Sequence, residues 1–491
     1  MKCAQQPNLI GYLFTNHSML RKSHLLLLAL LCIGLTVSAQ HQEIDEDPEI
    51  WKAREKAGVD SNSFLHAFKH GAVSGHLRYF FMATDNDKGL SDYFANAAGG
   101  GLKFETAKFK GFQMAISGFF TFNVGSSDFL KQDPKTGQMN RYEIGLFDLE
   151  DPLNKTDIDR LEELYLKYNF HRSSITLGKQ LINTPFINLQ DGRMRPTEVN
   201  GLWLDHKMKK TRIEGGLLYQ ISPRGTVKWY DVGKSIGVYS TGVNADGSNA
   251  EYENNTHTKG LAMLGITHKP NKNLAFQLWN IYTENIFRAS FLQIELDKEV
   301  GNKQKWIAGI QLFQQKRIGE GGNEELEKKY MQDKSSFVLS TKLGWEFNNW
   351  KTSFNFTRIT NQGRYTMPRE WGRDPFYTFM PRERNEGLAN VYAYVIKAGK
   401  SFPKQRVSAN LAIGHFNLPS VYDFSSNKYG LPSYNQLNLD LRYTFNGILT
   451  GLESQLLFVY KGKATNETID YKYIINKVNM SLWNIVLNYN F

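Results

Sequence analysis

Two pairs of arginine residues, each separated by a single residue, are the groups in this sequence best suited to hold an anion. Arg193 and Arg195 lie in the stretch LQDGRMRP, which also contains Asp191, and Arg382 and Arg384 lie in MPRERNE. A guanidinium group stays charged at physiological pH and binds a carboxylate through a planar fork of N–H donors. The arginines could therefore pass a carboxylate from one contact to the next, although Arg193 could instead tie down its own loop through Asp191.

A second set of cations lies within stretches that alternate between polar and apolar residues. They occupy polar positions of these stretches and are Lys167, Lys342, Arg442 and Lys461. Because successive side chains of a strand point to opposite faces, these four would lie on the water-facing side of a sheet. Acidic residues share the same faces, namely Glu163, Glu346, Asp440 and Glu453. Each cation could therefore bind a solute or be neutralised by a salt bridge within the protein.

No motif for catalysis or for a cofactor accompanies these charges. The sequence has no His-Glu-x-x-His helix, phosphate-binding loop, nucleophile elbow or cluster of Cys and His ligands. The segment DNDKG, which begins at Asp85, contains part of a calcium loop but lacks the remaining ligands. The formal net charge is +11, but the basic residues are dispersed among acids, which argues against nucleic-acid binding. We expect no cofactor, no metal and no enzymatic activity.

The first 39 residues have the pattern of a cleavable signal peptide. Arg21 and Lys22 precede the apolar run LLLLALLCIGL, and small residues end the segment at Ala39. Met19 is an alternative start to Met1. Both cysteines of the chain fall within this segment, so the mature protein would contain no disulfide. Residues 40–71 are polar and predict a periplasmic arm with a short helix at 48–56.

Strand periodicity governs the rest of the chain. In QLNLDLRYTF, at 436–445, leucines and aromatics alternate with polar residues, and SLWNIVLNYNF, at 481–491, repeats the pattern. Such alternation is typical of strands with lipid on one face and water on the other. Tyr489 and the final Phe491 resemble the carboxyl-terminal signature that the barrel assembly machinery reads in outer-membrane proteins.

The alternating stretches predict an all-β fold, a transmembrane antiparallel β-barrel of about 18 strands over residues 72–491. The strands are expected to begin near residues 72, 94, 111, 161, 173, 199, 210, 258, 272, 286, 304, 334, 350, 387, 404, 434, 451 and 478. Short periplasmic turns alternate with long outer loops, except near 284–303, where both connections are short. An even number of strands would put both termini on the periplasmic side, and a barrel of this width leaves room for an aqueous channel.

The stretch GKQLINTPFINLQDGRMRPTEVNGLWL resembles the third-loop signature of the porin D (OprD) family of outer-membrane porins. The matching positions are Asp191, Arg193, Pro196, Val199 and Gly201. GHLRYFFMATD at the start of the predicted barrel, MPRERNE, and LDLRY followed by GLESQLLFVYKG near its end are also similar to this family. Val199 departs from the Phe that the family favours, and the amino-terminal arm is longer than usual.

The resemblance implies a monomeric or trimeric channel whose inward-folded loops form a constriction beside a row of basic side chains. We therefore expect passive diffusion of small hydrophilic solutes, carboxylate-bearing or amino-acid-like, with the loop around Arg193 and Arg195 setting selectivity. The implied partners are outer-membrane lipid, lipopolysaccharide and the barrel assembly machinery of a Gram-negative cell. A sugar-selective porin and a barrel protease or lipase are the alternatives.

Overall fold

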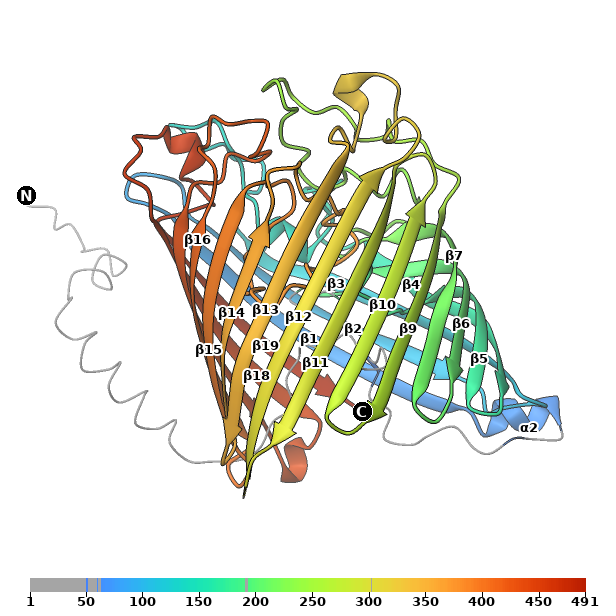
Figure 1. Cartoon of the computed structure of the whole chain (residues 1–491). Coiled ribbons are helices and arrows are strands. Elements are labelled where there is room, and N and C mark those ends of the chain that lie inside the picture. Colours follow the sequence, from blue (N-terminus) through green and yellow to red (C-terminus); the bar gives the residue numbers. More distant parts are fainter. Residues whose placement is uncertain (1–49, 52–59, 61–62, 190–192, 302) are drawn as a thin grey trace, which may run out of the picture.

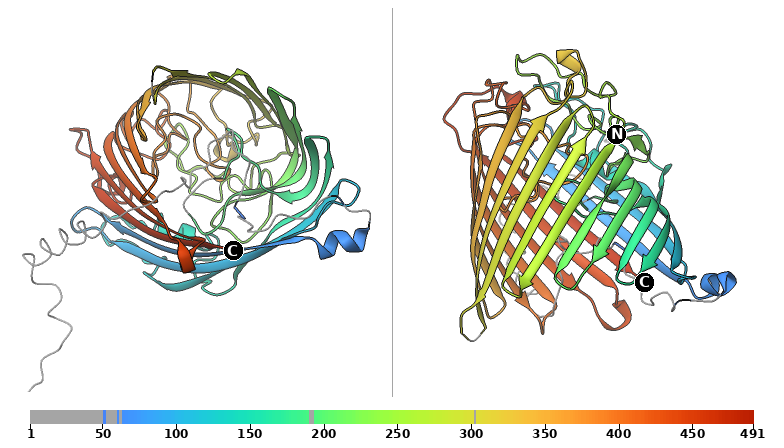
Figure 2. Two further views of the ribbon diagram at one scale, coloured as in Figure 1. Left: turned by 90° about the horizontal axis from the view of Figure 1, so that it is seen from below. Right: turned by 45° about the vertical axis from the view of Figure 1, so that its right-hand side comes forward.

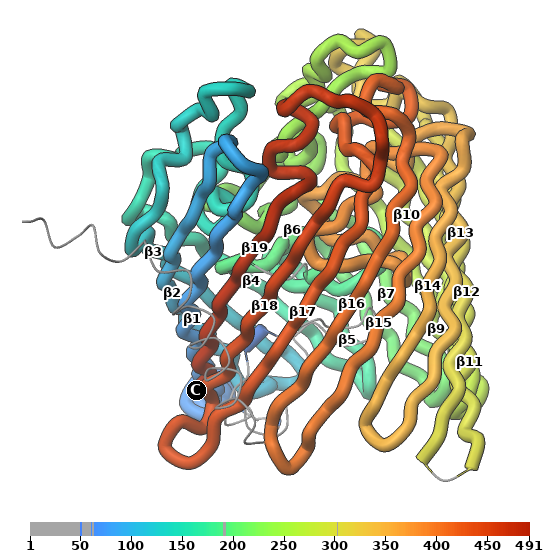
Figure 3. Tube along the Cα trace, turned by 90° about the vertical axis from the view of Figure 1, so that its left-hand side faces the viewer, coloured from blue at the N-terminus to red at the C-terminus, as the bar shows by residue number. Residues whose placement is uncertain are grey.

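Eighteen long strands close into an antiparallel barrel within residues 50–51, 60, 63–189, 193–301 and 303–491, which a computed structural model of the chain describes (Figure 1). Each strand pairs with the next, and β1 pairs with β19 from His76 opposite Asn490 to Asp85 opposite Ser481. Figure 3 shows this seam, with β1 lying beside β19. The fold predicted from the alternation is therefore confirmed.

The strands are β1 (Ala72–Asp85), β2 (Tyr93–Glu105), β3 (Phe112–Ser126), β4 (Ile158–Phe170), β5 (Ser173–Gln180), β6 (Glu198–Lys207), β7 (Thr211–Ser222), β8 (Tyr230–Asp231), β9 (Leu261–Asn271), β10 (Leu274–Thr283), β11 (Phe287–Glu299), β12 (Gln304–Arg317), β13 (Ser335–Phe347), β14 (Trp350–Ile359), β15 (Val391–Phe402), β16 (Val407–Asn417), β17 (Tyr434–Thr444), β18 (Leu452–Lys463) and β19 (Met480–Asn490). The helical elements are α2 (Phe64–Lys69), η2 (Glu143–Leu146), η3 (Leu326–Lys328), η4 (Gly447–Leu449) and η5 (Tyr471–Tyr473). No helix in the described part of the chain is both long and apolar enough to cross a membrane.

The two-residue period of the sequence separates the outside of the barrel from its lumen. In β19, Trp483 and Ile485 are exposed on the outer face, whereas Asn484 and Asn488 are buried on the inner face. Apolar side chains on the outside face lipid, and polar side chains on the inside face water or the loops. Each observed strand begins within a few residues of its predicted start.

Turns and loops alternate along the chain as expected, with short turns at one end of the barrel and long connections at the other (Figure 1). The β13–β14 turn consists of Asn348 and Asn349, both with positive φ, which is the turn that suits the twist of a two-residue hairpin. The connection between β10 and β11, residues 284–286, is the short exception at the outer end. The sequence pattern did not predict α2 or the two-residue strand β8, which pairs with β7.

Outer loops fold back into the barrel rather than standing above it. Figure 2 shows, from below, chain segments lying within the ring of strands. Trp371 and Phe376 of the β14–β15 connection are buried in one hydrophobic cluster with Phe287 and Phe313 of the wall. The lumen therefore contains a packed core as well as polar groups.

Candidate functional site

A cavity of about 410 Å³ lies inside the barrel between these loops and the wall formed by β1, β18 and β19. Its lining is strongly basic. The basic residues are Arg141, Arg193, Arg224, Arg369, Arg382, Arg384, Lys461 and Lys477. Among the described residues that line it, Glu383 is the one acid. Lys461 lies on a strand and the other seven cations lie in loops, so the loop conformation determines the charge of the cavity.

Arg193 lies in the β5–β6 connection and reaches the cavity wall, as its sequence position predicted. Its side chain packs closely on Gly145, where an added Cβ would lie 2.8 Å from Nε of Arg193. Burial, reinforced by nearby Arg382 and Arg224, lowers the pKa of Arg193. The close approach to Gly145 joins the β3–β4 and β5–β6 connections at the cavity.

Arg195 lies apart from the cavity, although only one residue separates it from Arg193. It is 3 % exposed, and its Nη1 and Nη2 atoms make no hydrogen bond with the described residues. Burial and the neighbouring Arg160 lower its pKa to about 9. The two arginines therefore face different surroundings. Asp191 falls outside the described residues, so its predicted partnership with Arg193 stays a prediction.

Arg382 and Arg384 both line the cavity, as expected for a loop that enters the lumen. Arg382 has a positive φ of 73°, and its carbonyl accepts a hydrogen bond from Nζ of Lys461 at 3.3 Å. Arg384 donates from Nη1 to the carbonyl of Gly372 at 3.2 Å. Between them, Glu383 is 1 % exposed, and burial raises its pKa. This turn thus presents two guanidinium groups with a weakened acid between them.

The predicted row of strand cations does not form one continuous path. Lys461 lines the cavity and lies 4.0 Å from the ring centroid of Tyr434. Arg442 instead forms a salt bridge with Asp440, with a shortest N···O distance of 2.7 Å, and Lys342 pairs with Glu295 at 2.6 Å. Of the two roles considered for these cations, Arg442 and Lys342 therefore take that of a partner in a salt bridge within the protein.

Two further predicted groups lie away from the cavity. Lys167 sits half-buried on the inner face of β4, in register with Gln113 and Thr176. Phe491 follows β19 and exchanges backbone hydrogen bonds with Gly75, with N···O distances of 2.8 and 3.0 Å. Its ring lies 5.8 Å from that of Tyr489. The carboxyl-terminal pair therefore helps to close the barrel seam, and its role as an assembly signal stays a prediction.

Four cavity cations were absent from the sequence prediction. They are Arg141, Arg224, Arg369 and Lys477, and each lies in a long connection. Loops carry no period that indicates where a side chain points, so only the folded connections bring these residues together. Proximity to a recognisable motif, which identified Arg193, Arg382 and Arg384, was available for none of the four.

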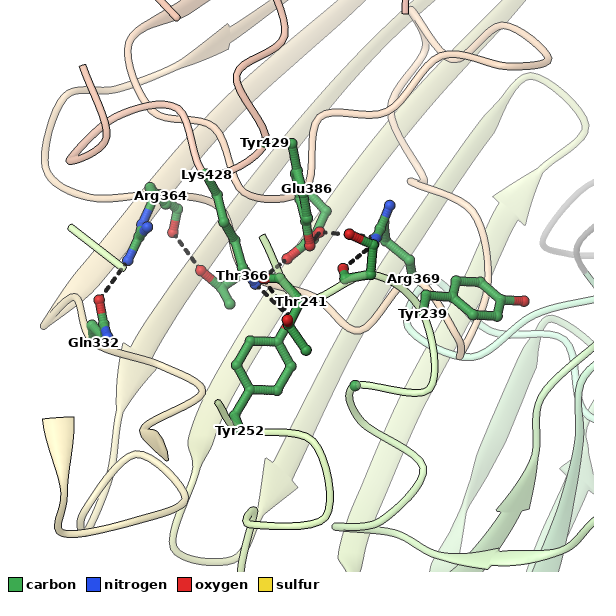
Figure 4. A network of polar contacts seen from close by, with 12 residues as sticks. Tyr239, Thr241, Tyr252, Gln332, Arg364, Thr366, Arg369, Glu386, Lys428 and Tyr429 are labelled. Atoms are coloured by element: carbon green, nitrogen blue, oxygen red, sulfur yellow. Dashed lines mark hydrogen bonds and ion pairs between the residues drawn. The ribbon is translucent and has the colours of Figure 1, made fainter. Parts of the chain in front are cut away.

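A buried polar network holds several outer connections over the lumen (Figure 4). Its centre is Glu386, which accepts hydrogen bonds from the hydroxyl of Tyr429 at 2.7 Å and from Nζ of Lys428 at 3.2 Å. Nε of Arg369 lies 3.4 Å from the same carboxylate, and Lys428 also donates to the hydroxyl of Tyr252 at 3.0 Å. Burial lowers the pKa of Lys428 to about 8. The network links the β7–β9, β14–β15 and β16–β17 connections.

Hydrogen bonds of the neighbouring residue Arg364 attach a fourth loop, the β12–β13 connection, to the same region. Arg364 donates from Nε to Asp333 at 3.2 Å and from Nη2 to Gln332 at 2.9 Å. Both acceptors belong to the β12–β13 connection. Arg369, which lines the cavity, is thus held by a network that spans most of the outer end of the barrel.

Comparison with solved structures supports the fold. OccD3 (OpdP) of Pseudomonas aeruginosa matches with a TM-score of 0.67 at 12% identity, covering 93% of this chain and 98% of that one. OpdK of the same organism, in a structure with vanillate, matches with a TM-score of 0.66 at 14% identity, over 86% and 99%. OccAB3 of Acinetobacter baumannii gives 0.66 at 15% identity, over 86% and 99%.

Comparison with protein families finds one that is similar to the middle of the chain. No curated protein matches the chain. The model of a family described as outer membrane porin, OprD family, matches residues 145–370, which include Arg193 and two of the other loop arginines of the cavity, Arg224 and Arg369. This span covers the β5–β6 connection in which the family signature was recognised. Residues 145–370, slightly less than half of the chain, are therefore similar to the OprD family of outer-membrane porins, and the solved structures share the fold of the barrel.

Proposed function

We propose that this porin selects small carboxylate-bearing solutes through its basic cavity. The observation that carries the proposal is the ratio of eight cations to one acid among the described residues around a space of about 410 Å³. Low-dielectric walls focus the field of such charges and raise the local concentration of oppositely charged solutes. A cation about 5 Å from a carboxylate contributes roughly 3 kcal/mol at an effective dielectric constant near 20, and about 0.8 kcal/mol in bulk water.

Aromatic rings supply the second part of the recognition surface. Phe80, Tyr142, Tyr239 and Phe379 line the cavity together with the cations. A flat carboxylate could pack its ring on these side chains while a guanidinium group holds its charged end. The vanillate present in the OpdK structure has this combination of ring and carboxylate. We therefore place aromatic carboxylates ahead of aliphatic ones among the solutes.

The transport is passive in this proposal. Several guanidinium groups surround one space, so a carboxylate exchanges one contact for another without a step that consumes energy. Each contact must be strong enough to admit the solute and weak enough to release it. The exported chain would lose residues 1–39 and keep 40–71 as a periplasmic arm, with the barrel over 72–491.

A planar-bilayer recording of the purified protein tests the selectivity. Salt gradients give the anion-to-cation permeability ratio, and benzoate, acetate, a cationic amino acid and a neutral sugar are then compared as permeant or blocking solutes. We expect a preference for anions and a stronger current block by benzoate than by acetate. A cation preference, or equal passage of sugar and benzoate, would refute the proposed selectivity while leaving the porin fold untouched.

A further inference from the structure

The short helix α2 lies outside the ring of strands, at the end of the barrel with short turns (Figures 1 and 2). It precedes β1 directly and ends at Lys69. In bacterial barrels the short turns face the periplasm. The helix is therefore placed beside the periplasmic boundary of the membrane, on the outer side of the barrel wall.

Aromatic contacts attach α2 to the lipid-facing surface. The ring centroid of Phe68 lies 6.1 Å from that of Phe104 in β2, and Phe64 lies 6.0 Å from Phe109. Phe104 points outward, because its neighbour Lys103 points inward and forms a salt bridge with Glu163 at 3.0 Å. The helix thus packs against the lipid-facing surface of the barrel and enlarges the apolar area of that surface.

Large apolar side chains of α2 are exposed in the described part of the protein. Leu65 is 63% exposed and Phe64 57% exposed, while Ala67 is buried. The carbonyl of Ala67 accepts a hydrogen bond from the amide of Ala107 at 3.0 Å, which fixes the helix to the β2–β3 turn. A helix of six residues is too short to persist alone in water, so its stability depends on contacts with other surfaces.

Further aromatic and basic groups continue around the same rim. Phe112 and Tyr168 are exposed on the outer wall, with ring centroids 4.7 Å apart. Lys69, at the end of α2, and Lys110, in the β2–β3 turn, are exposed as well. Aromatic rings settle at the boundary between lipid and water, and basic side chains there attract anionic headgroups.

We propose that α2 is a short interfacial helix that inserts into the periplasmic leaflet of the outer membrane. Phe64, Leu65 and Phe68 would lie at the boundary between headgroups and acyl chains, with Lys69 and Lys110 beside anionic phospholipid headgroups. Continuity with the lipid-facing wall favours lipid over a protein partner, because Phe104 and Phe112 already belong to that wall. Interfacial helices bind by this combination of apolar burial and headgroup attraction.

Site-directed spin labelling of the full chain tests the insertion. Cys3 and Cys32, the two natural cysteines, fall in the segment expected to be cleaved, so Leu65→Cys would supply the single cysteine of the mature chain. Leu264→Cys, on the outer face of β9, gives the lipid reference, and Glu320→Cys, in the exposed β12–β13 connection, gives the water reference. The protein is reconstituted in vesicles of phosphatidylethanolamine and phosphatidylglycerol. Collision rates of the label with oxygen and with a water-soluble nickel complex are then measured.

We expect the label at position 65 to resemble that at position 264, with nickel collisions several-fold lower than at position 320. Combining Lys69→Glu and Lys110→Glu should reduce this protection in vesicles with phosphatidylglycerol and leave it unchanged in phosphatidylcholine alone. Nickel access equal to that at position 320 would overturn the proposal. Protection that arises only when a periplasmic extract is added would also overturn it, because it would assign the surface to a protein.

Discussion

Replacing Arg193 by Met should lower the anion preference of the channel, whereas the same change at Arg195 should leave it nearly unaltered. Arg193 lines the cavity and Arg195 does not. Methionine keeps much of the side-chain length and fills the space beside Gly145, so the substitution removes mainly the charge. The pair forms a matched comparison, because both arginines are buried and lie in the same connection.

The size of the effect follows from Coulomb's law in a wet cavity. One unit charge about 5 Å from the solute contributes roughly 0.8 kcal/mol in bulk water and roughly 3 kcal/mol at an effective dielectric constant of 20. Seven other cations remain around the cavity, and water fills the path of the solute, so we take a value near the lower limit, about 1 kcal/mol. That value corresponds to about a fivefold decrease in the anion-to-cation permeability ratio.

Reversal potentials across a salt gradient in planar bilayers measure this ratio. Both variants are first checked for barrel formation by their heat-modifiable migration in gels. A fivefold decrease for Arg193→Met with little change for Arg195→Met would support the assignment of the cavity as the selectivity region. Equal shifts for both variants, or none for Arg193→Met, would refute it, because charge outside the cavity would then control the current.

Three further changes have defined outcomes. Glu386→Gln should increase current noise and protease cleavage of the outer loops, because it leaves the buried Lys428 and Arg369 without this carboxylate partner. Removing one partner of a buried ion pair destabilises a fold by about 3–5 kcal/mol. The control Glu324→Gln, at an exposed position, should change neither the noise nor the cleavage. The anion preference should decrease as the pH rises through about 7, because burial near Arg141 lowers the pKa of Lys477 to about 7 and its cavity-lining ammonium then loses its proton. A Lys477→Met channel should lack this part of the pH response, measured as the reversal potential against pH, and an unchanged response would exclude Lys477 as its source. Deleting Phe491 removes roughly 2 kcal/mol of apolar burial and two seam hydrogen bonds, and should lower the amount of surface barrel while inserted channels conduct normally; normal surface levels would argue against an assembly role.

The barrel was predictable because its two environments impose a strict period. Every second residue of β17 and β19 must suit lipid, so Leu439 and Ile485 mark the outside without any tertiary information. The number of residues between successive alternating stretches also distinguishes the short turns from the long connections. It could not reveal β8, which is two residues long, or α2, whose six residues depend on contacts with the β2–β3 turn.

The cavity was only partly predictable because its charges come from loops. Arg193 and Arg195 have the same residue type, spacing and flanking signature, yet only one reaches the cavity, since loop conformation decides where each side chain points. Strand periodicity placed Lys461 and Arg442 correctly on the inner face. It could not show that Asp440 neutralises Arg442, because periodicity defines a face but not the partner on it.

The acids of the loops explain how a chain with 59 basic and 48 acidic residues presents so uneven a charge to its lumen. Glu370 accepts hydrogen bonds from the backbone amides of Gly237 and Tyr239 at 3.1 and 2.9 Å, and Asp374 accepts one from the amide of Asn385 at 2.9 Å. These carboxylates are buried behind the cavity lining, where they fasten one loop segment to another. Neither carboxylate is among the described residues that line the cavity. The cavity potential therefore depends on which side of the loop wall each charge occupies, and the net charge of the sequence does not contain that information.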